Sequence, residues 1–504
     1  MSEQARTTAT VEHATAPWRV HMTIPVSVMT LTLALWLTPH VAQAQPSDDV
    51  PAGEQAMAEL SALQEVEATS TAGSLPSLPG LFERALQHDS ELSRQRFELE
   101  ATEQEVPMAR SQLLPQVTAS GGYLWQDSTN IQTSPEDFGL DQPAQRPGEI
   151  DEHFWQLQLR QPLFSLERWR GRERAESQVS AAELDLALVE RNLALQVSEA
   201  YINAYLASRK LGLLEAQQEA LSLQARQAQR AYDLGVGDRI NLLEAQSRLD
   251  QAIADAVQAE NELDDALSQL ERLTGELPDF GDHRLGDISA VRLGEDWSDE
   301  QQWLAQIGNN LDVQRADADR SIAESDTRVR RSGYYPELNL NLSYSDRKSD
   351  DELRESEDYR ASIEFSMPLY RGGYTRASVR QGELRSRSSQ EAIDHQRNLA
   401  AQEVRQRLRS LNGSLRRLSA LQQAIESSEL FLQAAERGEQ LGLRDLVDVL
   451  DARASLYDQR IQYVDTLGRY AIDRLALHSA VGALSTEDLG QVMQLLSSIT
   501  PRQT

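Results

Sequence analysis

The fold of this chain is decided by the stretch Leu441-Gly442-Leu443-Arg444-Asp445-Leu446-Val447-Asp448-Val449-Leu450-Asp451-Ala452. Its pattern is that of a helix end, a tight turn and the start of a second helix. Gly442 can take the left-handed conformation that ends a helix, and Asp445 can cap the next one. Asp445, Asp448 and Asp451 then recur every third residue and share one face. Another face is apolar: Leu446, Val449, Leu450 and Leu456. Alone, this pattern is most typical of a surface helix with a solvated acidic face.

The same design occurs once more in the chain, 207 residues earlier. Leu234-Gly235-x-x-Asp238 matches Leu441-Gly442-x-x-Asp445, and Leu243-Glu244-Ala245 matches Leu450-Asp451-Ala452. Two further motifs also recur, Arg110-Ser111-x-x-x-Pro115 as Arg331-Ser332-x-x-x-Pro336 and Pro162-Leu163-Phe164 as Pro368-Leu369-Tyr370. The chain is therefore a tandem duplication of one unit, which runs helix, strand, loop, strand, very long helix, turn and long helix.

The segments on either side of each turn predict unusually long helices. Residues 165–234 contain no proline after Ser165, only two glycines, and apolar positions at helical spacing. This predicts one helix of roughly 65 residues, about 100 Å long. A second helix should run from the turn to Thr274-Gly275. Because a globular domain does not hold helices of this length, we expect a coiled-coil-like assembly. Residues 78–113 are also helical in pattern, with a break near His88-Asp89 and a boundary or kink at Pro107.

Two pairs of strands complete the unit. In the second pair, residues 337–345 and 359–369 alternate apolar and polar side chains around an acidic loop, 346–358. In the first pair, residues 117–125 alternate only loosely, and residues 155–163 follow a polar loop, 127–153, with Pro162 closing the strand. Segments of about ten residues with this dyad pattern are typical of a membrane β-barrel, and an edge hairpin of a soluble sheet is the alternative.

Composition narrows the function further. The 504 residues carry a net charge of −30, which opposes nucleic-acid binding through basic patches. There is no cysteine, so disulfides and thiolate sites are excluded. Residues 1–44 predict a cleaved secretory signal, with an apolar run from Ile24 to Leu37 and an Ala42-Gln43-Ala44 site. After residue 44, no apolar run approaches the roughly 18 residues of a membrane-spanning helix.

Four strands cannot close a barrel, and open strand edges are not tolerated in lipid. The chain should therefore oligomerise, with each copy contributing four strands. Two copies would make eight strands, whose interior fills with side chains, whereas three would make twelve and leave an aqueous lumen. Because the long helices continue from the strands, we expect them to extend the pore as a helical tube.

Three features of the chain together match one known family: the duplicated unit, the strand-ending Pro162-Leu163-Phe164 and Pro368-Leu369-Tyr370-Arg371-Gly372-Gly373, and the Leu441–Ala452 turn. In these features the chain resembles the TolC family of outer-membrane efflux and type I secretion channels. The resemblance covers roughly residues 78–495. It implies a mainly α fold with a small membrane β part: a homotrimer with a 12-stranded barrel in the outer membrane of a Gram-negative bacterium and a helical tube across the periplasm.

The domain boundaries that follow are a signal peptide (1–44), a low-complexity extension expected to be disordered (45–77), a first repeat (78–275), a linker or equatorial segment (276–302), a second repeat (303–485) and a C-terminal segment (486–504). The resemblance also implies partners: outer-membrane lipid, a periplasmic adaptor protein, and an inner-membrane transporter of the RND, ABC or MFS type. No nucleic acid and no cofactor are expected.

The resemblance assigns roles to residues of the two turns. Asp448 and Asp451 match the two aspartates that ring the periplasmic entrance, and Arg444 matches the arginine that helps to hold it closed. On the partner turn the family often has an aspartate where this chain has Asn241, and Glu244 is a candidate substitute. The turns themselves, with Gly235, Asp238, Gly442 and Asp445, are expected to contact the adaptor.

Electrostatics supports such a gate independently. Three copies of Asp448 and Asp451 would place six carboxylates at one constriction, with no dedicated metal site but with the capacity to bind blocking cations. Like charges about 8 Å apart repel by roughly 0.5 kcal/mol in water and about 2 kcal/mol at an effective dielectric constant of about 20. A closed entrance therefore needs arginine pairs between neighbouring helices to offset this repulsion.

Other classes of protein fit the sequence less well. The eight histidines are scattered, without metal-ligand spacing, and no glycine-rich phosphate loop follows a strand, so the sequence does not predict an enzyme. An exported coiled-coil structural or adhesion protein without a pore remains the alternative, although it would not need duplicated amphipathic strands. The cargo of a channel stays open between drugs or toxic amphiphiles and type I secreted proteins.

Overall fold

The computed structural model describes residues 75–127, 149–281, 283–286, 288, 291, 297–350 and 354–500. All of them belong to one compact unit, residues 71–504. The predicted signal segment and residues 45–74 lie outside the described residues, as do 128–148 of the loop in the first strand pair. Of the helices in the described ranges, none is both long enough and apolar enough to cross a membrane.

Helices dominate the described part of the chain. Before the first strand pair lie α2 (Leu78–His88), α3 (Ser90–Glu103) and α4 (Glu105–Ser111). The first pair is β1 (Gln116–Asp127) and β2 (Glu149–Ser165), followed by α5 (Leu166–Asp233) and α6 (Arg239–Thr274). The second half contains α7 (Glu300–Ala305), η3 (Ile307–Asn309), α8 (Leu311–Ser332), β3 (Glu337–Ser349), β4 (Ser356–Ser366), α9 (Tyr374–Gln440), α10 (Leu446–Ala480) and α11 (Thr486–Ser497).

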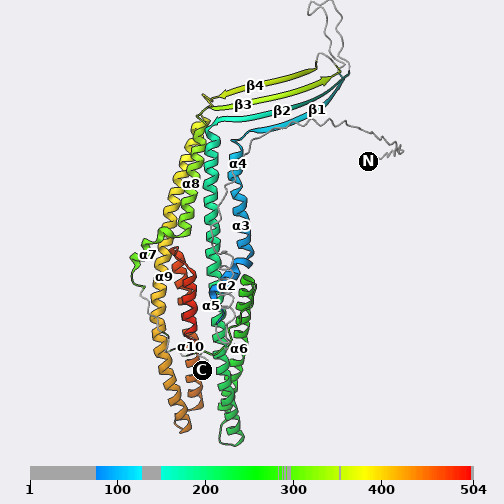
Figure 1. Cartoon of the computed structure of the whole chain (residues 1–504). Helices are drawn as coiled ribbons and strands as arrows, with labels where there is room; N and C mark the ends of the chain where they lie inside the picture. Colours follow the sequence, from blue (N-terminus) through cyan, green and yellow to red (C-terminus); the bar gives the residue numbers. More distant parts are fainter. Residues whose placement is uncertain are drawn as a thin grey trace, which may run out of the picture. The chain divides into compact units, whose positions relative to one another are not determined.

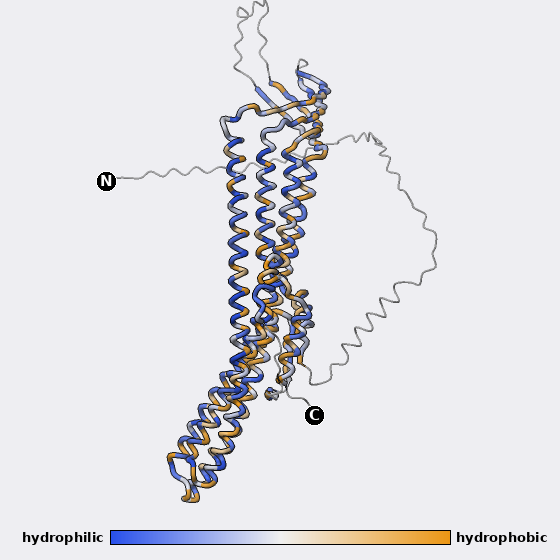
Figure 2. Tube along the Cα trace, turned by 90° about the vertical axis from the view of Figure 1, so that its left-hand side faces the viewer, coloured by the Kyte–Doolittle hydropathy of each residue, from blue (hydrophilic) through white to orange (hydrophobic). Residues whose placement is uncertain are grey.

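The predicted long helices are confirmed. α5 has 68 residues and α9 has 67, so each is about 100 Å long. Figure 1 shows both of them running from the strands to the turns. α6 ends at Thr274 because Gly275 takes a left-handed conformation, with φ 72°. Apolar and hydrophilic positions are interspersed along these helices (Figure 2), as expected for helices that bury only one stripe.

The N-terminal helices break where the sequence predicts. Asp89 ends α2 and caps α3, because its Oδ1 accepts the Leu92 N–H at 2.7 Å. Pro107 lies at a boundary, in the first turn of α4, where its missing N–H breaks no helical bond. The end of the predicted extension is packed: the Tyr201 hydroxyl donates to the Pro76 carbonyl at 2.8 Å.

The strands form one antiparallel sheet in the order β1-β2-β3-β4. The prediction that Pro162 closes the second strand is wrong, since β2 continues to Ser165. The register between β2 and β3 shifts between Pro162 and Phe164, and such a bulge accommodates a residue that has no N–H to donate.

Both predicted loops include residues that belong to strands of this sheet. β2 begins at Glu149, inside the expected loop 127–153, and β3 and β4 reach into the expected loop 346–358, to Ser349 and from Ser356. Charged side chains do not end these strands, because backbone pairing continues beneath exposed side chains: Arg347 pairs with Phe154. β4 in turn stops at Ser366, before the expected Leu369, two residues ahead of Pro368.

The helical core lies where the two repeats meet. α5 packs against α6, α8 and α10, and α9 packs against α8 and α10. The main apolar cluster joins α5, α6, α9 and α10 to α2, α11 and the described parts of 276–302, with Phe280 and Trp297 buried. Burial raises the pKa of Tyr463 in this cluster to about 12, while a bond from Gln422 acts in the opposite direction. The residues of the two halves therefore share one core.

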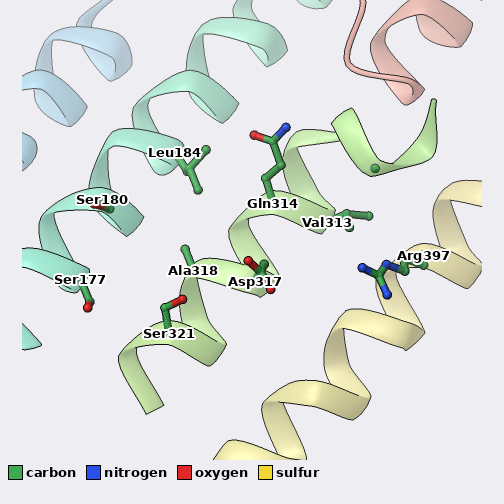
Figure 3. A pocket seen from close by; sticks show the side chains of 10 residues that line it. Ser177, Ser180, Leu184, Val313, Gln314, Asp317, Ala318, Ser321 and Arg397 are labelled. Carbon is green, nitrogen blue, oxygen red and sulfur yellow. The ribbon is translucent and has the colours of Figure 1, made fainter. Parts of the chain in front are cut away.

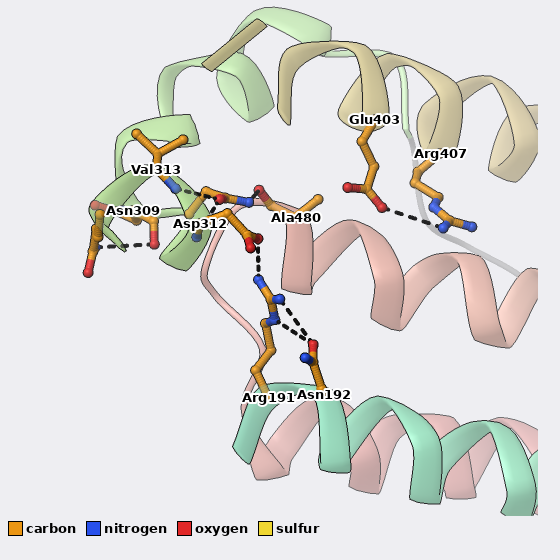
Figure 4. A network of polar contacts seen from close by, with 10 residues as sticks. Arg191, Asn192, Asn309, Asp312, Val313, Glu403, Arg407 and Ala480 are labelled. Atoms are coloured by element: carbon orange, nitrogen blue, oxygen red, sulfur yellow. Dashed lines mark hydrogen bonds and ion pairs between the residues drawn. The ribbon is translucent and has the colours of Figure 1, made fainter. Parts of the chain in front are cut away.

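A polar joint fixes α8 on the end of α10. Asn310 is only 3% exposed, and its Nδ2 donates to the Ala480 carbonyl at 2.8 Å. Its Oδ1 accepts the N–H groups of Asp312 and Val313, at 2.9 and 3.1 Å. Arg191 of α5 then reaches Asp312 at 2.6 Å (Figure 4). The buried amide thus links α8 to α10, and the ion pair between Arg191 and Asp312 adds α5.

We expect Asn310→Ala to lower the stability of the protein by about 1–3 kcal/mol, because it leaves buried backbone groups without partners. The effect should appear as a lower unfolding midpoint in denaturant. Asn309→Ala is the matched control, since this exposed neighbour makes its described bonds through the backbone alone, from its N–H to Gln306 and from Gln314 to its carbonyl. Equal losses in the two variants would contradict the role given to the Asn310 side chain.

Candidate functional site

The two turns have the same backbone geometry. Gly235 and Gly442 both have φ 72°, as the sequence predicts. Val236 N–H donates to the Ala231 carbonyl at 3.0 Å, and Leu443 N–H donates to the Gly438 carbonyl at 2.8 Å, which is the same bond 207 residues later. The duplication therefore extends to individual hydrogen bonds.

The caps after the turns differ. Asp238 caps α6, because its Oδ1 accepts the Asn241 N–H at 2.7 Å and its Oδ2 accepts the Asn241 amide at 3.3 Å. Asp445 occupies the N-cap position of α10, but the prediction that its side chain caps the helix is wrong. The Asp448 N–H, which a capping side chain would bind, donates to the Asp445 carbonyl at 3.1 Å instead.

The two candidate gate aspartates have different arginine partners. Arg444 pairs with Asp448 at 3.3 Å, and both side chains are about half exposed. This pair joins residues four apart at one helix start, so within the chain it links no two helices. Asp451 pairs instead with Arg248 of α6 at 2.8 Å.

Arg248 is a residue that sequence reasoning missed. Its Nε binds Glu244 at 2.9 Å while its Nη2 binds Asp451, so it ties α6 to the start of α10. The i, i+4 spacing of Glu244 and Arg248 was a signal for the first bond. Nothing in the sequence pairs Arg248 with a residue 203 positions away. Glu244 joins this cross-link, whereas the described bonds of Asn241 stay within its own turn.

Apolar contacts seat the start of α10 on the first hairpin. Leu450 is 1% exposed and belongs to a cluster with residues of α5 and α6: Leu221, Ala225, Ala245 and Ala252. Val449 is also buried, which confirms the predicted apolar face. The two gate aspartates at the start of α10 are more open to solvent: the Asp448 side chain is 46% exposed and that of Asp451 60%. The start of α10 therefore presents carboxylates while its apolar face stays covered.

One chain does not complete a metal site at this position. In the described residues of a single chain, no three acidic or histidine side chains gather closely enough to hold an ion. The carboxylates of the turns could act together on a cation only if several copies brought them to one place.

A separate pocket of 580 Å³ lies between α5, α8 and α9 (Figure 3). It is lined mainly by small and polar residues: Ser177, Ser180, Leu184, Gly308, Val313, Gln314, Asp317, Ala318, Ser321 and Arg397. Along α5, Ser177 is about 85 Å from the turn, so the pocket is unconnected with the candidate gate. Its Arg397 pairs with Asp394 at 3.3 Å.

A duplicated chain with four antiparallel strands in one sheet and two long helical hairpins has the architecture of an outer-membrane channel subunit. The chain belongs to the outer membrane efflux protein family, whose model matches residues 81–276 and 305–483, one match in each half. This is a family of efflux proteins rather than of enzymes.

Individual relatives agree with this assignment. The outer membrane protein TolC of Salmonella enteritidis is 26% identical over 441 residues, which are 83% of this chain and 84% of that protein. The alkaline protease secretion protein AprF of Pseudomonas aeruginosa is 28% identical, over 83% of this chain and 87% of AprF.

Solved structures share the fold. The open state of the Neisseria gonorrhoeae MtrE outer membrane channel has a TM-score of 0.68 at 18% identity, covering 82% of this chain and 91% of MtrE. The outer membrane protein VceC of Vibrio cholerae has a TM-score of 0.67 at 18% identity, covering 80% and 96%. The predicted mainly helical fold with four strands per chain is confirmed.

Proposed function

We propose that this chain is the outer-membrane exit channel of a tripartite export system in a Gram-negative bacterium. Three copies form a 12-stranded barrel in the outer membrane, and their helices form a tube across the periplasm. The observation that carries the proposal is a sheet of four amphipathic strands with unpaired outer edges, attached to helices about 100 Å long. Membership of an outer-membrane efflux family supports it.

The sheet edges support assembly. β1 and β4 are the edge strands, and they are exposed along their whole length in the single chain. They carry large apolar side chains that are more than half exposed: Val117, Tyr123, Trp125, Tyr359, Ile363 and Phe365. Joining β1 of one copy to β4 of the next would remove every edge, and three copies give a barrel with an aqueous lumen.

The turns are the surface that we assign to the adaptor. Leu234, Val236, Leu441 and Leu443 are 74–81% exposed, which places four apolar side chains at the tips of the two hairpins. Gly235 and Gly442 form the turns at these tips, and Asp238 and Asp445, three residues further along each turn, belong to the same proposed surface. A periplasmic adaptor covering the tips would link the channel to an inner-membrane RND, ABC or MFS transporter.

The gate that we propose consists of Asp448 and Asp451 from three copies. Arg444, in the turn before α10, screens Asp448, and Arg248 holds Asp451 against α6 together with Glu244. Opening would then require the start of α10 to leave its contacts with α5 and α6. On this account Glu244, rather than Asn241, is the residue of the first turn that takes part in gating.

The cargo is a drug-like amphiphile or a type I secreted protein. Two relatives have names that refer to the secretion of proteases and one has a name that refers to cation efflux, so the cargo differs between members. The two classes separate in a deletion strain: greater drug susceptibility with an unchanged secretome identifies efflux, and the reverse result identifies secretion.

Membrane fractionation tests the channel itself. The protein should be recovered in the outer-membrane fraction that is extracted with detergent. Recovery in the soluble periplasmic fraction would contradict a channel and favour the exported coiled-coil protein without a pore.

A further inference from the structure

A concentration of arginine lies where the strands join the helices. Four ten-residue segments flank the four strands on this side: 106–115, 166–175, 327–336 and 367–376. Together they contain ten arginines and two glutamates, with no aspartate and no lysine. The whole chain, in contrast, has 79 acidic and 49 basic residues. This end of the sheet is therefore basic, whereas the chain as a whole is acidic.

The opposite end of the strands is acidic. The connecting segments 127–153 and 346–358 contain 14 acidic and four basic residues. The charge of the chain thus changes sign along the strands, from acidic at the connecting segments to basic at the helices. Most of the charged side chains that the structure describes at the two ends are exposed or half-buried, so burial in the fold does not explain this change of sign.

Four of the ten arginines lack a carboxylate partner in the described part of the chain, and we call them the arginine collar: Arg110, Arg168, Arg371 and Arg376. Arg168 donates to the Gln112 carbonyl at 2.8 Å, and the other three side chains are exposed. The remaining six are paired, for example Arg331 with Glu383 at 3.2 Å. Each collar arginine lies within ten residues of a strand end. Four uncompensated charges per chain are thus available to an external anion.

Exposed aromatic side chains accompany the collar in the same segments. Trp169, Tyr334, Tyr335, Tyr370 and Tyr374 are between 45% and 86% exposed. Tryptophan and tyrosine with a wet polar tip and an apolar body are enriched where a bilayer meets water. The aromatic residues indicate, independently of the charges, that this level is a membrane interface.

We propose that the arginine collar binds the phosphate groups of anionic phospholipids in the leaflet of the outer membrane that faces the periplasm. The inference rests on the proposed function, since it requires the strands to lie in a bilayer. Guanidinium groups pair well with phosphate oxygens. Each basic residue near an anionic membrane surface strengthens binding to that surface about fivefold. Three copies would place twelve such arginines around the base of the barrel.

Reconstitution of the full-length mature protein tests this proposal. The probe is phosphatidylglycerol, supplied in nanodiscs with phosphatidylcholine, and the readout is the ratio of the two lipids retained by the protein on native mass spectrometry. The wild type should prefer phosphatidylglycerol about fivefold or more, and the preference should fall towards one at high salt, where charges are screened within about 3 Å.

The decisive variant is Arg110→Gln, Arg168→Gln, Arg371→Gln and Arg376→Gln combined, in which the preference should disappear. The matched control removes four arginines that also lack carboxylate partners among the described residues but lie far from the strands: Arg226→Gln, Arg230→Gln, Arg409→Gln and Arg416→Gln. This control should keep the wild-type ratio. An unchanged ratio in the collar variant would overturn the proposal.

Two outcomes separate this inference from the channel itself. A protein that inserts as a trimer in both lipid mixtures, with no preference for phosphatidylglycerol, contradicts only the collar. A protein that inserts in neither mixture contradicts the proposed function. Trimers of the collar variant that are weakened equally in both mixtures would assign these arginines to contacts between copies and overturn the lipid proposal.

Discussion

Replacing Asp448 and Asp451 together by alanine will weaken divalent block and lower the cation selectivity of the channel in single-channel recordings. Trimerisation would place six carboxylates at one constriction, and both side chains are about half exposed or more, so they retain free oxygen atoms for cations. Loss of interactions of about 2 kcal/mol each should raise the divalent concentration for half-block more than tenfold.

A control keeps this test specific to position. Asp264→Ala with Asp265→Ala removes the same charge from exposed positions of α6, well away from the turn. Block and selectivity should remain at wild-type values in that variant. If the two double variants behave alike, or if the divalent concentration for half-block is unchanged in the first, the selectivity ring lies elsewhere in the channel.

Replacing Arg248 by glutamine will shift the channel towards its open state by about tenfold. The bond of Arg248 to Asp451 joins α6 to α10, and because both side chains are well exposed it contributes only about 0.5 kcal/mol per copy. Three copies together contribute about 1.5 kcal/mol to the closed state. The open fraction in planar-bilayer recordings measures the shift. Arg444→Ser should also raise it, but by less, because Arg444 binds its own helix.

Two variants distinguish the bond from its charge. Arg239→Gln removes the same charge near the turn from an exposed arginine for which no ion pair is described, and it should leave the open fraction almost unchanged. Arg248→Glu combined with Asp451→Arg should restore closure, since the reversed pair can form again. A double variant as open as Arg248→Glu alone would contradict the cross-link.

Much of this fold could be predicted from the sequence because the decisive signals are local and occur twice. Gly235 and Gly442 mark the two turns, and the pattern after Ser165 predicts α5 almost to the residue. These features depend on backbone preference and on apolar periodicity, which a short window contains.

The remainder depends on partners far apart in the chain. Pro162 ends a strand in isolation but is accommodated by a bulge against β3. Asp445 is a good capping residue, yet its carbonyl takes the N–H that its carboxylate would bind. The pairing of Arg248 with Asp451 exists only because the first turns of α10 pack between α5 and α6. Such contacts are set by the packing of the repeats, so no local pattern could specify them.

The most direct test of a trimeric channel is the mass of the purified complex, measured by native mass spectrometry after extraction from the outer membrane. We predict three copies of the mature chain, which close a 12-stranded barrel around an aqueous lumen. A stable complex of two copies, or a monomer, would contradict the account, because eight strands leave no lumen and four strands leave open edges in lipid.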